Sequence, residues 1–324
     1  MKKVLYSMLA FMLVLPLAFG LVACGNNEPE IAGVESAEEF LEAFAAESSV
    51  ALGANITLDE KLDIDKDIEI NLNGKTLTFA GDINIDTAKF IIRNNAERTV
   101  KIKNGTIVYT SEVDSELTFS CITNYGNLTL ENVSLQFGNL NVATGDNRLD
   151  GIANWGEGNV VIKNSTISLT VDDTSRVYKT CGIFSLGRSL VFENSTLTLN
   201  CSANSSYGIY NYINVGEVDP GTRTATITGS TINLTGAEIN SLSGVFAESY
   251  VEGEDNKAVI IIGANTVVNV TRTAESGSGK ITYGLRAKGN AVITGANNAT
   301  ITLTDNTECT KLERGPETTG VIED

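Results

Sequence analysis

The stretch Val160-Val161-Ile162-Lys163-Asn164-Ser165-Thr166-Ile167-Ser168-Leu169, residues 160–169, reads as two short strands joined by a polar corner. Val160 and Ile162 occupy every second position of the first strand, and Ile167 and Leu169 do the same in the second. This period of two is typical of a strand with one buried face. Asn164 suits the corner because asparagine tolerates the left-handed backbone region. So short a corner predicts a sharp bend between the two strands.

The same unit recurs eight times along the chain, at intervals of about 30 residues, a period typical of solenoid proteins. Asparagine or glycine usually stands two positions after the strand-ending apolar residue, and serine or threonine follows two positions later. The strand-ending residues are Leu72, Ile102, Leu130, Ile162, Phe192, Ile227, Ile262 and Ile293. Eight units held so closely in phase indicate a repeat architecture.

A third strand precedes each pair, for example at Gly151-Ile152-Ala153-Asn154 and Gly208-Ile209. Three short strands in about 30 residues make one coil, and stacked coils pair each strand with its equivalents above and below. The chain is therefore predicted to be all-β: a right-handed, single-stranded parallel β-helix of about eight coils, with three parallel sheets. This resembles the right-handed β-helix of the pectin-lyase-like superfamily, over about residues 55–305. The resemblance is one of architecture, and no catalytic motif of that superfamily accompanies it.

An open solenoid end is an exposed sheet edge, which proteins usually cover. Ser36 and Glu39 have the spacing of a capping box, and the apolar residues that follow recur with helical spacing. We therefore expect a capping helix over 36–48 at the start of a domain that spans 34–310. The polar residues 311–324 are expected to form a flexible tail.

The N-terminus has the pattern of an export signal, with Lys2 and Lys3 before an apolar run. The sequence Leu21-Val22-Ala23-Cys24 looks like a bacterial lipobox, which implies removal of residues 1–23 and lipid on Cys24. Residues 24–33 would then be a tether, and the protein would be extracytoplasmic and lipid-anchored at a bacterial membrane or cell surface. The alternative is an ordinary cleaved signal with a structural Cys24.

Composition excludes several functions. The chain has 40 acidic and 23 basic residues, a formal net charge of −17, and no histidine. Such a charge repels nucleic acid, and an anionic polysaccharide would need a bridging cation such as Ca²⁺. The lack of histidine excludes a zinc site with histidine ligands and any Ser–His or Cys–His nucleophile pair. We expect no cofactor, with Ca²⁺ possible at acidic side chains: Asp172, Asp173, Glu254 and Asp255.

Cysteines give little further guidance. The spacing of Cys121, Cys181, Cys201 and Cys309 fits no metal motif. A disulfide remains open, with Cys181 and Cys201 as the preferred pair.

Aromatic residues follow the first strand of several coils, and alternation would direct them outward. A one-residue change of register would direct them into the core instead, so both directions stay open. The residues are Tyr125, Trp155, Phe184, Tyr210, Tyr212 and Phe246. Two long loops, 211–223 and 247–257, belong to neighbouring coils and add four further candidates: Glu217, Asp219, Glu248 and Tyr250. Insertions on one face of a repeat protein are often its binding face.

Three functions are consistent with these patterns. The first is a surface-tethered, non-catalytic protein that binds a polysaccharide or other glycan in a groove at the aromatic strip and the two long loops. The second is a polysaccharide lyase or glycoside hydrolase with an atypical site, in which Arg286 would be the base and Asp150 an acidic partner. The third is an adhesion or structural surface module. An enzyme requires these groups to converge in one cleft, whereas a sugar-binding protein requires outward rings without such a pair.

Overall fold

The computed structural model describes residues 33–80, 90–109, 118–140, 148–171, 178–214, 221–237, 240–253, 255–273, 280–305 and 309–324. Gly33–Asp324 form one compact unit. The expected signal, Cys24 and residues 25–32 of the expected tether lie outside the described residues. Within them, no helix has both the length and the apolar character needed to cross a bilayer.

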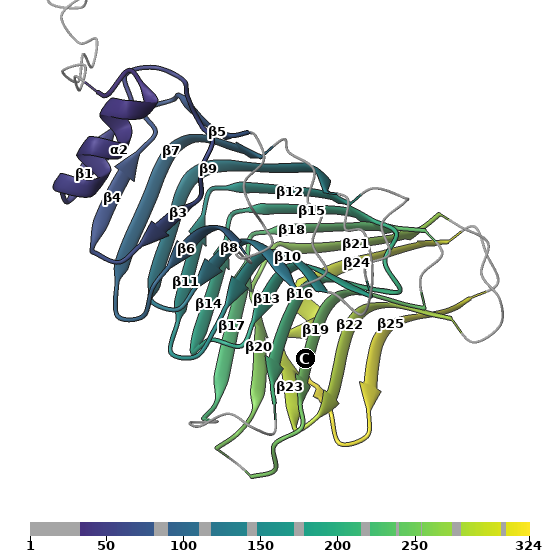
Figure 1. Ribbon diagram of the computed structural model, residues 1–324. Coiled ribbons are helices and arrows are strands. Elements are labelled where there is room, and N and C mark those ends of the chain that lie inside the picture. The colour runs from purple at the N-terminus through teal and green to yellow at the C-terminus, as the bar shows by residue number, and fades with distance from the viewer. Residues whose placement is uncertain are drawn as a thin grey trace, which may run out of the picture. The chain divides into compact units, whose positions relative to one another are not determined.

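The unit is a parallel β-solenoid of about seven turns, close to the eight coils expected (Figure 1). Three strand-bearing faces, here named A, B and C, follow one another in every complete coil. Face A is a separate nine-stranded sheet. Its strands are β3 (Leu62–Ile64), β6 (Phe90–Asn94), β8 (Phe119–Asn124), β10 (Arg148–Asn154), β13 (Lys179–Ser185), β16 (Ser205–Ile213), β19 (Ser241–Ser249), β22 (Ile281–Gly289) and β25 (Thr310–Glu317).

Faces B and C join into one 17-stranded sheet, because two long strands run through the corner between them: β7 (Thr99–Tyr109) and β9 (Asn127–Leu140). The other strands of face B are β1 (Ser49–Ala51), β4 (Ile68–Asn71), β11 (Asn159–Lys163), β14 (Ser189–Glu193), β17 (Arg223–Thr228), β20 (Ala258–Ile262), β23 (Ala291–Thr294) and β26 (Val321–Ile322). Those of face C are β2 (Ile56–Leu58), β5 (Thr76–Phe79), β12 (Thr166–Val171), β15 (Thr196–Cys201), β18 (Thr231–Gly236), β21 (Thr266–Arg272) and β24 (Ala299–Asp305).

The core is a set of columns that run along the solenoid. Ile162 pairs with Leu130 on one side and with Phe192 on the other, and all three side chains are fully buried. The predicted interior column is therefore confirmed. Alternation along each strand supplies its neighbours, since the strands of faces B and C bury every second residue.

The corner between faces B and C is built as the repeat predicts. Asn104, Asn132, Asn164 and Asn194 all have positive φ, between 48° and 58°. The left-handed backbone conformation costs asparagine less free energy than it costs most other residues with a side chain, which explains why asparagine recurs there. The corner row is therefore explained by backbone geometry alone and needs no functional role.

Both ends differ in detail from expectation. The capping helix α2 (Ala37–Ala46) is shorter than 36–48; Ser36 Oγ accepts a hydrogen bond from the Glu39 amide at 3.2 Å, and Phe40 is fully buried. Residues 311–324 do not form the expected tail, because β25 pairs with β22 and β26 pairs with β23. Backbone pairing to the preceding coil outweighs the polar composition, and charged side chains suit an edge strand.

The preferred disulfide does not form. Cys121, Cys181, Cys201 and Cys309 are all free thiols. Cys181 lies in β13 on face A, whereas Cys201 ends β15 on face C, so the two belong to different walls of the solenoid.

Candidate functional site

The outer side of face A carries a second apolar cluster, separate from the central core. It comprises Ala153, Cys181, Phe184, Leu186, Tyr207, Tyr210 and Phe246, with Trp155 and Tyr212 packed against it. The alternation of inward and outward residues is interrupted on face A at a position that holds glycine in several successive strands. A Cβ on Gly182 would lie 2.8 Å from Leu197 of the core, and the next residue, Ile183, also points into the core. The residues on either side, Cys181 and Phe184, therefore both point outward.

This arrangement shows which way the first-strand aromatic side chains point, and it corrects the expectation that they are open to a ligand. The rings of Phe184, Tyr210 and Phe246 do point away from the core, yet each is at most 2% exposed. They are buried because they pack on one another along the solenoid: Tyr210 and Phe246 stack with centroids 4.8 Å apart, and Phe184 meets Tyr210 edge-on at 5.6 Å. These three rings are therefore not an open shelf for a ligand.

Cations lie over the rings of this cluster. The Arg148 guanidinium carbon is 3.7 Å from the centroid of Phe184, and Arg286 is 4.4 Å from that of Phe246. Lys179 Nζ lies 5.1 Å from the centroid of Tyr210. Such contacts are attractive because the ring face carries negative potential.

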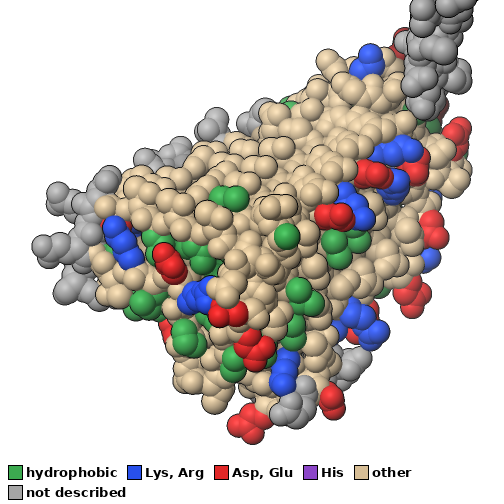
Figure 2. Space-filling view, turned by 180° about the vertical axis from the view of Figure 1, so that it is seen from behind, with side chains coloured by type: hydrophobic (Ala, Val, Ile, Leu, Met, Phe, Trp, Pro, Cys, Tyr) green, Lys and Arg blue, Asp and Glu red, His purple; other side chains and the backbone are tan. Residues whose placement is uncertain are grey.

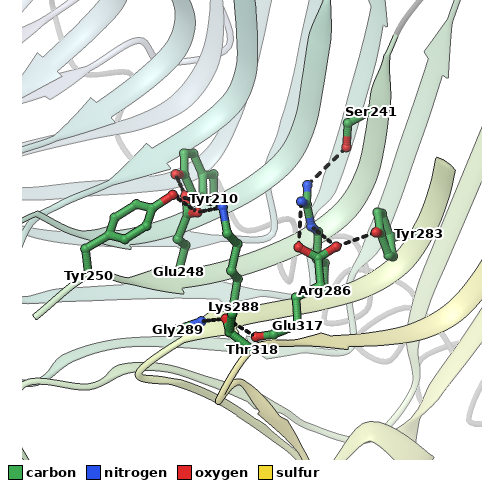
Figure 3. A network of polar contacts seen from close by, with 10 residues as sticks. All are labelled: Tyr210, Ser241, Glu248, Tyr250, Tyr283, Arg286, Lys288, Gly289, Glu317 and Thr318. Atoms are coloured by element: carbon green, nitrogen blue, oxygen red, sulfur yellow. Dashed lines mark hydrogen bonds and ion pairs between the residues drawn. The ribbon is translucent and has the colours of Figure 1, made fainter. Parts of the chain in front are cut away.

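Glu248 is the centre of a first polar network (Figure 3). Its carboxylate accepts hydrogen bonds from Tyr210 and, at 2.6 Å, from Tyr250, and it pairs with Lys288 at 2.9 Å. Burial raises the pKa of Glu248, but these donors outweigh burial and hold its pKa below the ordinary value. Burial and the nearby carboxylate raise the pKa of Tyr210. Of the four residues, only Tyr250 keeps a largely exposed ring.

A second network fixes Arg286 (Figure 3). Its Nη2 lies 3.0 Å from Glu317 Oε2 and its Nε 3.2 Å from Oε1, while Nη1 donates to Ser241 at 3.1 Å. Tyr283 also donates to Glu317. Glu317 raises the pKa of Arg286 against the opposing effect of burial. A guanidinium held in this way is a poor general base.

Asp150, the acid expected to assist Arg286, lies elsewhere. β10 and β22 are separated by β13, β16 and β19, about 19 Å at the usual strand spacing. The Asp150 side chain is fully buried, with Arg148 Nε at 2.9 Å and Ser120 Oγ at 3.2 Å. Burial raises its pKa despite the pairing with Arg148. The two residues do not converge, so the geometry does not assemble the expected lyase pair.

A pocket of about 440 Å³ opens on the outer side of face A, over β6, β8 and β10. Aromatic rings, hydroxyl groups and two guanidinium groups line it: Phe90, Tyr125, Trp155, Thr118, Ser120, Thr123, Arg93 and Arg148. Tyr125 is 40% exposed and Trp155 is half-buried. No acidic residue is among the lining residues, although acids outnumber bases in the chain.

Two of these eight residues, Tyr125 and Trp155, were predicted from the sequence. Arg93 pairs in register with Thr123 of β8, which pairs with Ala153 of β10. The same column continues through Phe184 and Tyr210. Extending the outward column back to β6 would have found Arg93. Arg148 lies two residues before Asp150 on the same side of β10, and its ion pair with Asp150 fixes its position.

Most of the remaining expected residues are not placed. Glu217, Asp219, Asp172, Asp173 and Glu254 lie outside the described residues. Asp255 is exposed. No group of three acids or cysteines with the geometry to hold a metal occurs in the described part of the chain.

Comparison with known proteins gives little beyond the fold. No family model matches the sequence, and no curated protein matches it either. A search of solved structures finds a chain described as "L. reuters 100-23 SRRP", with 16% sequence identity and a TM-score of 0.42, over 90% of this chain and 97% of the other. At this identity and score the match supports no statement on function, and what is established for this chain is a parallel β-solenoid.

Proposed function

We propose that this protein is a non-catalytic carbohydrate-binding protein, held at a bacterial membrane or cell surface by lipid on Cys24. The observation that carries the proposal is the pocket on face A, where the exposed ring of Tyr125 and the half-buried ring of Trp155 lie beside hydroxyl and guanidinium groups. The proposed site keeps Tyr125 and Trp155 of the expected aromatic strip, but it lies over the earlier coils and does not include the two long loops that were expected to form part of it.

The chemistry of the lining fits a sugar. An aromatic ring offers an apolar face with which the C–H groups of a pyranose can stack, and such rings are favoured at recognition sites. Thr123 can donate to or accept from sugar hydroxyls, whereas Ser120, whose hydroxyl donates to Asp150, can accept. Arg93, which is paired with Asp63, and Arg148 can only donate. Each exchange of a solvated hydroxyl for a protein partner yields little net free energy, so binding is expected to be weak.

The same lining argues for binding without chemistry. Glycoside hydrolysis requires two carboxyl groups on either side of the scissile bond. The lining residues that the structure describes carry none, and Asp150 is buried behind Arg148. Arg286, the expected base, is paired with Glu317 in the C-terminal coils.

The test is a glycan array with the compact unit, residues 33–324, followed by affinity measurement for any glycan bound. Trp155→Ala and Tyr125→Ala should each weaken binding at least tenfold. Tyr178→Ala is the matched control, because Tyr178 is 49% exposed and does not line the pocket. Binding that survives both pocket substitutions would place the site elsewhere, and time-dependent cleavage of a bound glycan would show that the protein is an enzyme.

The anchor is tested separately with the full chain. Cys24→Ala should abolish incorporation of a labelled fatty-acid precursor and move the protein out of the membrane fraction. Unchanged labelling and fractionation of the variant would show that Cys24 is not lipidated.

A further inference from the structure

Charge is unevenly spread over the surface. In Figure 2 the charged and hydrophobic side chains gather in a band, and a broad area above this band shows no charged side chain. Among the described residues, the outward positions of face C carry no charged side chain, since Arg272 and Asp305 at the ends of β21 and β24 have buried side chains. The three outward positions on each of β12, β15, β18, β21 and β24 hold ten threonines, three asparagines, one serine and one valine.

These fifteen side chains form a regular two-dimensional array. Thr196, Thr198 and Asn200 of β15 pair directly with Thr231, Asn233 and Thr235 of β18, and the same register holds without a shift from β12 to β24. Rows are therefore about 4.8 Å apart, and neighbouring positions within a row about 6.6 Å apart. On β9, Ser134 and Gln136 pair in the same register with Thr166 and Ser168, but the register shifts after Leu169, so rows with three regular positions begin at β12.

Strand propensity alone does not explain this composition. Threonine is favoured in strands, but so are valine, isoleucine and tyrosine. Face B belongs to the same coils, and one of its strands, β17, also presents threonine at its three outward positions. The strands beside it present Val161 and Lys163 on β11, Val191 and Glu193 on β14, and Ile261 on β20. Propensity thus accounts for threonine on a single strand, whereas an uncharged, threonine-rich surface that continues over five successive strands of face C requires a further cause.

On this surface the side chains recur at one fixed spacing along the strands and another across them. Such a surface is complementary to a partner whose own groups recur at similar spacings. Each threonine offers a hydroxyl, which can donate and accept a hydrogen bond, beside a methyl group. The array has no charged side chains, which would order hydration shells around themselves. It also has no aromatic rings, on which the faces of sugars stack. Ordered water is the partner that needs neither, and the oxygen atoms of ice repeat at spacings close to those of the array.

We propose that the outer surface of face C, over β12, β15, β18, β21 and β24, binds the surface of ice crystals. The stiffness of the solenoid is what makes this possible, because the side-chain positions are fixed by the pairing of the strands before any contact with ice. This site lies on a different wall from the glycan pocket, and neither inference depends on the other.

The test uses residues 33–324 and compares two lysine variants of the array, Thr198→Lys and Thr235→Lys, with a matched variant of face B. Thr226→Lys is that control, since Thr226 is an outward, half-buried threonine of β17. Wild type and Thr226→Lys should depress the freezing point below the melting point and shape single ice crystals. Both array variants should lose this activity to the level of an albumin control, with unchanged circular dichroism and melting temperature.

Three results would overturn the proposal. The first is wild-type behaviour equal to that of albumin. The second is equal activity in array and control variants. The third is pull-down of the wild type, but not of the array variants, by crystalline cellulose or chitin, which would assign the surface to a polysaccharide lattice. Trp155→Ala should keep full activity on ice, so failure of the glycan proposal and failure of this one are told apart.

Discussion

Asn124 Nδ2 donates a hydrogen bond to Asn154 Oδ1 across one coil of the solenoid, at 2.8 Å. Asn124 Oδ1 in turn accepts from Asn94 Nδ2 at the same distance. All three side chains are buried, and Asn124 also reaches the carbonyl oxygen of Gly126 at 2.8 Å. This amide ladder supports the corner that follows face A and therefore the wall that carries the pocket.

Asn124→Ala should destabilise the protein by about 1–3 kcal/mol, because it leaves buried donors and acceptors without partners. Denaturant unfolding followed by circular dichroism measures the change. Asn127→Ala is a matched control, since Asn127 is an exposed asparagine that accepts a hydrogen bond from Asn159 one coil away. The control should stay within about 0.5 kcal/mol of wild type. Equal effects of the two substitutions would mean that the buried ladder adds nothing.

The burial of this ladder could not be predicted from the sequence, although other features of the corners could. The asparagines of the other corner, Asn132, Asn164 and Asn194, could be predicted because the left-handed backbone restricts which residues fit. Inward positions such as Ile162 could be predicted because burial imposes a strict period. No such rule tells whether Asn124 is buried, since either exposure is compatible with a corner.

The outer surface was predicted less well for a related reason. Outward side chains interact with partners one coil away, which are set by strand register and by repeat lengths that vary from 28 to 35 residues. Arg286 and Glu317 are 31 residues apart, and their pairing depends on a strand that was expected to be a tail. The aromatic residues were found by their position, but stacking, which buries Phe184 and Tyr210, became visible only once the coils were in register.

The interior column offers a direct test of the fold. Phe192→Ala should cost about 3–5 kcal/mol, because it removes a buried ring and leaves a cavity between Ile162 and Ile227, its partners on either side. Unfolding in denaturant measures this cost. Val191→Ala is the control on the same strand, since its side chain points outward and is half-buried. A loss below about 1 kcal/mol for Phe192→Ala would place this residue outside the core.

The ion pair of Arg286 and Glu317 should hold the last strand of face A. Glu317→Ala removes the acceptor of Arg286 and Tyr283, so the amides of β25 should exchange with solvent faster, while those of β13 stay as in wild type. Local stability should fall by about 1.5–3 kcal/mol, the range for hydrogen bonds to charged groups. Hydrogen exchange read by mass spectrometry resolves the two regions. Exchange of β25 that is already fast in the wild type would show that residues 310–317 are a loose tail after all.

Glu248 should make stability depend on pH in the acid range. Its folded-state pKa lies below the ordinary 4.5, since the hydrogen bonds from Tyr210, Tyr250 and Lys288 outweigh the effect of burial. A carboxyl group with a lowered pKa stabilises the fold fully above its unfolded pKa, and this stabilisation is lost as the pH falls from about 4.5 through the folded pKa. Glu317 has a lowered pKa as well, so it contributes in the same direction.

Glu248→Gln keeps the shape of the side chain but cannot ionise, and it removes the acceptor charge that Lys288 contacts at 2.9 Å. Its free energy of unfolding should be lower than that of wild type near neutral pH. The difference should shrink as the pH falls below about 4.5, because the wild type then also loses its carboxylate. Urea unfolding at a series of pH values gives the two curves, with Glu252→Gln as the control for an exposed glutamate of the same coil. A constant offset between wild type and Glu248→Gln across this range would show that the proton on Glu248 is not linked to folding.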